Sequence, residues 1–209
     1  LAACDGPLMA AIVQHAQNAV DAASVSVGSA QGWATPKAGN ILVAITNSDA
    51  VIDSLTGWTS RAHFLSDQDF WVYEKTAVGT ESTISAALSS TDNATLTVIE
   101  LDASVVDSFD LASAVHSANS NALSFTVTSA TTTGAAGDLI LAIVALHGHS
   151  VLPTLTSWDN SFTALSTSQV GAAAAGVTGF VASRQTTAAA ATGTTTCAWD
   201  QTADNQAAF

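Results

Sequence analysis

One apolar segment occurs twice in this chain with little change. It reads AGNILVAI at residues 38–45 and AGDLILAI at residues 136–143, roughly a hundred residues later. In each copy a glycine-containing turn leads into a run of Ile, Leu, Val and Ala that is too short for most helices and typical of a strand buried on both faces. The repeat therefore predicts a duplicated β architecture.

The flanking sequence repeats as well. The alternating segments SVSV (24–27) and SFTV (124–127) precede the two copies, and a period of two residues indicates half-buried strands. After each copy come a tryptophan in a polar turn, two strands, a second polar turn and a last strand. These paired segments are the turns at Trp58 and Trp158, the strands 70–77 and 179–187, the strands 82–89 and 194–200, the turns 90–93 and 202–205, and the last strands 94–103 and 206–209.

Each half is therefore expected to hold five strands. The predicted halves are 24–103 and 124–209, joined by a crossover at 104–123, and residues 1–23 are expected to form an N-terminal arm or an edge strand. A five-stranded half exposes an apolar face, and two halves can bury these faces by packing their sheets about 10 Å apart. We predict one all-β sandwich of two pseudo-symmetric five-stranded halves. Six apolar residues of the repeat are expected to be mostly buried: Leu42, Val43, Ile45, Leu139, Leu141 and Ile143.

The charge of the chain is strongly acidic and disfavours some partners. Asp and Glu total 17 against four Lys and Arg, which gives a formal net charge of −13. Such a surface repels phosphate backbones and anionic lipids, so we expect no nucleic-acid and no membrane partner. Cys4 and Cys197 lie far apart without metal-type spacing, and the sequence leaves open whether they pair.

The sequence gives little sign of catalytic or metal chemistry. His147 and His149 could point the same way from a strand end, but further ligands are not evident. Asp67 and Asp69 could contribute to a Ca²⁺ site, but no recognisable calcium loop surrounds them. No nucleophile elbow and no phosphate-binding glycine loop occurs. We expect a protein that is not an enzyme and that needs no metal or cofactor.

The five tryptophans are the other candidates for function. Trp58 and Trp158 recur in both halves and are expected to anchor loops or the core. Trp33 and Trp71 have no tryptophan counterpart in the other half. Exposed aromatic rings stack on sugars, so Trp33 and Trp71 are the candidate carbohydrate contacts.

Several motifs resemble those of a known family. The pattern A-G-(D/N)-L-L-(V/L)-A corresponds to 38–44 and 136–142, G-W-T to 57–59, and Tyr-x-Lys to 73–75, although the second half lacks the last two. This is similar to the duplicated jelly-roll-like β-sandwiches of tailed-phage virion proteins and some bacterial surface proteins. The resemblance implies a structural role on the exterior of the virion, as capsid decoration, head fibre or tail appendage. The implied partners are a capsid or tail protein and copies of the chain itself in a homo-oligomer.

Two other functions remain open from the residues. One is a carbohydrate-binding adhesin module that recognises a host surface glycan. The other is a subunit of an extracellular filament that exchanges β-strands, because an apolar terminal arm can supply a strand to a neighbour's edge. The candidate assembly contacts lie at the two ends of the chain, at Leu8, Met9, Ile12, Val13 and Phe209.

Overall fold

The computed structural model describes most of the chain as β-strands. The described residues are 12–53, 55–65, 68–104, 116–127, 137–149, 151–171, 176–187 and 194–208. The elements are β1 (Ile12–Val27), the 3₁₀ turn η1 (Ser29–Gln31), β2 (Ile41–Ser48), β3 (Thr59–Leu65), β4 (Asp69–Thr76), β5 (Ile84–Leu101), β6 (His116–Val127), β7 (Leu139–His147), β8 (Leu155–Trp158), β9 (Thr163–Val170), β10 (Val177–Gln185) and β11 (Thr195–Ala208). The all-β prediction is confirmed. None of the described residues forms a helix long and apolar enough to span a membrane.

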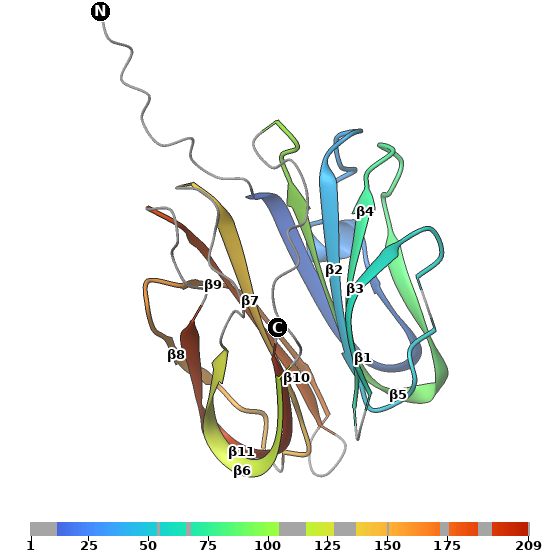
Figure 1. Cartoon of the computed structure of the whole chain (residues 1–209). Helices are drawn as coiled ribbons and strands as arrows, with labels where there is room; N and C mark the ends of the chain where they lie inside the picture. The colour runs from blue at the N-terminus through green and yellow to red at the C-terminus, as the bar shows by residue number, and fades with distance from the viewer. Residues whose placement is uncertain are drawn as a thin grey trace, which may run out of the picture.

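The strands form two antiparallel sheets, one from each half of the chain (Figure 1). The first has the order β1-β5-β2-β4-β3, and the second has the order β6-β11-β7-β10-β9, with β8 paired to β11 outside that path. When each strand is matched to its counterpart in the other half, the two orders are the same. That the halves superimpose, and that their connectivity is jelly-roll-like, remain predictions.

The repeated turn makes the same hydrogen bonds in both halves. Gly39 has φ 92° and Gly137 has φ 98°, in a region that glycine adopts without steric cost. The N–H of Gly39 donates to the Ala77 carbonyl at 2.9 Å, and the N–H of Gly137 donates to the Thr186 carbonyl at 2.8 Å. In return, each partner's N–H donates to the carbonyl of the residue after the glycine. The A-G-(N/D) motif therefore fixes where β2 and β7 begin.

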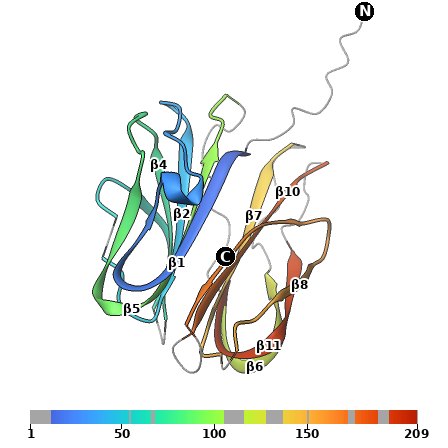
Figure 2. The ribbon, with the colours of Figure 1, turned by 180° about the vertical axis from the view of Figure 1, so that it is seen from behind.

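The strand boundaries differ from those expected. Residues 90–93, expected as a turn, lie inside the single 18-residue strand β5, and β3 occupies residues expected as a polar turn. β1 continues through residue 23 and pairs with β5, with a register shift between Ala22 and Ser24. Figures 1 and 2 show that these long paired strands curl at one end of the sheet. A curled strand can carry polar residues at its bend without ending, which is why the polar segment was mistaken for a turn.

The core has more layers than a simple sandwich. Ile41, Val43 and Ile45 of β2 face Ile143 and Val181 of the second sheet, in a core shared by both halves. The alternate residues of β2 face the other way, into a core that belongs to the first half alone. The second half has its own core as well, around Phe180 and Trp199. Each sheet is thus covered on both faces, which explains the continuous apolar runs.

Four of the six expected core residues are buried. Leu42 and Val43 are 0 % exposed, Ile45 is 5 % exposed and Ile143 is 1 % exposed. Leu139 and Leu141 are intermediate in exposure, so they are less completely buried than the other four. These two leucines lie at the start of β7, at the margin of the shared core, where one side of each remains open to solvent.

Candidate functional site

Trp33 is a core residue and not a surface residue. Its exposed fraction is 3 %, and its Nε1–H donates to the Glu81 main-chain carbonyl at 2.8 Å. Trp33 comes just after η1 in the chain, and its ring packs into the first half's own core. It offers no open face on which a sugar could stack, so we withdraw Trp33 as a carbohydrate contact.

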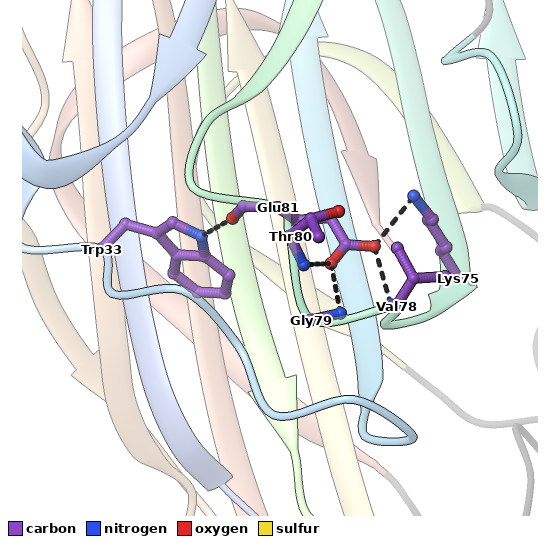
Figure 3. A network of polar contacts seen from close by, with 6 residues as sticks. All are labelled: Trp33, Lys75, Val78, Gly79, Thr80 and Glu81. Carbon is purple, nitrogen blue, oxygen red and sulfur yellow. Dashed lines mark hydrogen bonds and ion pairs between the residues drawn. The ribbon is translucent and has the colours of Figure 1, made fainter.

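The Glu81 carboxylate is the centre of a polar network beside Trp33 (Figure 3). Oε1 accepts the Val78 N–H at 2.9 Å and pairs with Lys75 Nζ at 3.0 Å, while Oε2 accepts the N–H groups of Gly79 and Thr80 at 3.0 and 3.1 Å. Burial opposes ionisation of this carboxylate, but the hydrogen bonds and Lys75 outweigh it and hold the pKa of Glu81 at about 2. The network closes the turn between β4 and β5 and leaves neither oxygen available to a ligand.

Trp71 lies at the surface of the first sheet within a row of rings. Its ring stacks on His63 with centroids 3.5 Å apart and on Tyr73 with centroids 5.2 Å apart. On the same face of β4, Lys75 Nζ lies 6.0 Å from the ring centroid of Trp58. Trp58 and Trp71 are both half-buried. This aromatic row comprises His63, Trp71, Tyr73 and Trp58. Tyr73 is only 1 % exposed, so within the row a sugar contact remains a prediction at the half-buried Trp71.

Asp69 is an internal anchor at the end of this row. Oδ1 lies 2.8 Å from His63 Nε2, and Oδ2 accepts the Ile52 N–H at 2.6 Å. Burial, followed by the charge of Asp69, raises the pKa of Tyr73 to about 12. The Asp69 carboxylate is thus occupied by internal partners, and Asp67 lies outside the described residues. Among the described residues, Asp69 is the only hydrogen-bond partner of the His63 ring, so no nucleophile completes a triad there.

The two histidines of the LHGHS segment are buried where the halves meet. His147 is 8 % exposed and His149 is 0 % exposed. His147 Nε2 lies 2.9 Å from Asp49 Oδ1, and His149 Nε2 lies 3.1 Å from Thr178 Oγ1. In the part of the chain that the structure describes, no three His, Cys, Asp or Glu side chains are arranged to hold a metal ion.

The expected assembly residues are only partly described. Leu8, Met9 and Phe209 lie outside the described residues, as does Cys4. Ile12 opens β1 and packs half-buried against the shared core, whereas Val13 is 54 % exposed. Cys197 is fully buried, and burial raises the pKa of its thiol, so it is an unreactive core residue.

The sequence does not predict β6 as an edge strand. In the described pairings, β6 bonds only to β11, which leaves its other side unpaired. Its twelve residues, HSANSNALSFTV, include no Asp, Glu, Lys, Arg or Pro, and Leu123 is 51 % exposed. The lack of charge could have been read from the sequence, but its position at a sheet edge could not.

Comparisons with known proteins do not place this chain in a family. No protein-family model, no curated protein and no solved structure matches it. Its function is therefore argued from the geometry above and from the motifs of the sequence.

Proposed function

We propose that the protein is a non-enzymatic structural component on the exterior of a tailed phage particle. It would act by docking on a capsid or tail protein and on copies of itself. The observation that carries this proposal is the uncharged edge of β6, which pairs with β11 alone among the described strands. The occupied carboxylates of Glu81 and Asp69 also support it, because these buried acids hold backbone N–H groups of their own fold in place.

The β6 edge lacks charged residues and proline, although its pairing with β11 contains register shifts. Edge strands are commonly blunted by charges, proline, bulges or short length, since their unpaired N–H and C=O groups attract other strands. β3, an edge strand of the first sheet, is blunted in this way: it has Arg61 and a register shift between Ser60 and Ala62. β6 is twelve residues long and carries none of these charges or prolines. Such an edge is suited to accept an extended strand from another chain.

Net charge favours the same edge as a docking surface. A body with a formal charge of −13 repels its own copies and other acidic proteins. An uncharged strand is where this repulsion is smallest, and main-chain hydrogen bonds there require no particular side chain. The proposed partner therefore presents an extended strand.

Leu123→Lys tests this docking. A lysine at this position adds charge to the edge and should weaken association about tenfold or more. The measurements are the oligomer population by sedimentation and the occupancy of the chain on purified particles by electron microscopy. Val51→Lys is the matched control, because Val51 is also 51 % exposed but lies outside the named strands. Equal loss in both variants, or no loss in Leu123→Lys, would refute edge docking.

A carbohydrate-binding module is the second candidate, favoured by the aromatic row around Trp71. Trp71 and Trp58 are half-buried on one face of the first sheet. Lys75 Nζ lies near the Trp58 ring and pairs with Glu81. If this face binds a glycan, Trp71→Ala should abolish retention on a polysaccharide column, and Trp33→Phe should not. If the column does not retain the wild-type protein either, the result counts against the glycan function. If the pure protein forms helical polymers, this would instead favour the third function, a subunit of an extracellular filament that exchanges β-strands.

A further inference from the structure

The interface between the two sheets changes character along its length. Near the starts of β2 and β7 it is apolar, whereas near their ends it contains buried polar groups. Thr97 Oγ1 lies 3.2 Å from Ser166 Oγ across the interface. The Asn47 amide donates to the carbonyls of Leu146 and Thr178 at 3.2 and 3.3 Å. Polar contacts of this kind join the halves at this end, and the buried histidines His147 and His149 lie among them.

His149 is tightly enclosed at this polar end. Its ring packs on Gly176, where an added Cβ would lie 2.3 Å from the ring Cε1 atom. Nε2 has Thr178 Oγ1 as its partner, and Nδ1 has no hydrogen-bond partner among the described residues. Burial, followed by the charge of His147, lowers the pKa of His149. Among the described side chains, none accepts a second proton from the ring, and the close contact with Gly176 limits its movement on that side.

The charged groups around His149 are few. Among the described side chains, His147 precedes it on β7 and Asp49 lies beyond His147, 2.9 Å from its Nε2. β9 carries no charged residue. The single charged residue of β10 is Arg184, which lies opposite Ile140 in the strand register, at the far end of β7 from His149. On β5, the Asn93 side chain lies against Gly171, which follows β9. Asp92 is its neighbour in the strand, so its side chain points to the opposite face. On β11, which pairs with β7 at His147, the Asp200 carboxylate accepts the Thr154 N–H. Among the described side chains, no carboxylate hydrogen-bonds to His149.

We propose that this end of the interface is an acid-sensitive joint, which opens at mildly acidic pH when His149 takes up a proton and leaves its place against Gly176. In the closed form the buried His149 ring is neutral. In the open form the ring is in water and has its ordinary pKa near 6.5. The closed form is therefore fully favoured above that pH. Below it, the open population rises by up to about tenfold per pH unit, the limit for one proton.

Hydrogen exchange of the whole chain between pH 7.5 and 5.5 tests the joint. The reporter is the Gly148 N–H, which donates to the Gly176 carbonyl at 3.1 Å. After correction for the intrinsic pH dependence of exchange, its protection should fall several-fold per pH unit below about 6.5. Amides at the centre of β2 and β5 should keep their protection, since they lie in the apolar part of the body.

Two variants separate His149 from the other histidines. His149→Phe should remove the pH dependence at Gly148, whereas His15→Phe, at an exposed position on β1, should leave it unchanged. An unchanged slope in His149→Phe, or equal loss of protection in the centre of the sheets, would overturn the proposal. Should His149→Phe fail to fold, ring NMR of the wild type decides. A His149 ring that titrates while Gly148 stays protected contradicts the joint, and one that titrates only as Gly148 opens supports it.

Discussion

Leu42→Ala should lower the free energy of unfolding by about 3–5 kcal/mol. The side chain is 0 % exposed and faces Ala44, Tyr73 and Leu96 in the first half's own core. The substitution removes transfer free energy and leaves a cavity that the surrounding strands cannot close, because β2 is held on both sides by β4 and β5. Urea unfolding at neutral pH measures the loss.

Leu141→Ala provides the comparison on the second sheet. Its side chain is half-buried at the margin of the shared core, so we expect a loss of about 1–2 kcal/mol, well below that of Leu42→Ala. In the repeated sequence Leu141 corresponds to Val43, and both lie at the shared core, whereas Leu42 lies one position earlier in the repeat and faces the first half's own core. A loss at position 141 equal to that at 42 would mean that the core is not layered as described.

The sequence predicted the strands whose pattern is set by burial on both faces. β2 and β7 follow from short apolar runs after a positive-φ glycine, and both begin where expected. β3 was missed because its residues TSRAHFL lie on an edge, where one side of the strand remains polar. β5 was divided in two because a polar segment on a curved ladder has the same composition as a turn.

Predictions for individual sites failed where tertiary contacts decide exposure. Trp33 follows a short loop, and nothing local shows that a carbonyl 48 residues away accepts its N–H. Asp69 was considered as a calcium ligand, but His63 and the Ile52 N–H occupy its oxygens through a contact between strands and a loop. The Glu81 network uses backbone N–H groups as donors, and any residue except proline supplies these, so no sequence motif records it.

Glu81→Gln should cost about 2–3 kcal/mol of stability at pH 7. The folded state holds the pKa of Glu81 at about 2, below the value of 4.5 for a free side chain, because the donors around it favour the charged form. A group of this kind contributes its full stabilisation above pH 4.5 and loses it as the pH falls toward 2. The difference between wild type and Glu81→Gln should therefore shrink through that range. Denaturant unfolding of both proteins at pH 7, 4 and 3 measures it.

Asp21→Asn is the control for general charge effects. Asp21 is exposed on β1, so this variant removes one negative charge from a strongly acidic chain without disturbing a buried network. It should be neutral or slightly stabilising at pH 7, since it reduces self-repulsion. The Glu81 network predicts the opposite sign for Glu81→Gln, because the amide keeps one acceptor oxygen but presents N–H groups to backbone donors and loses the pair with Lys75. A loss in Glu81→Gln that stays constant from pH 7 to pH 3 would show that packing, and not the carboxylate charge, holds this turn.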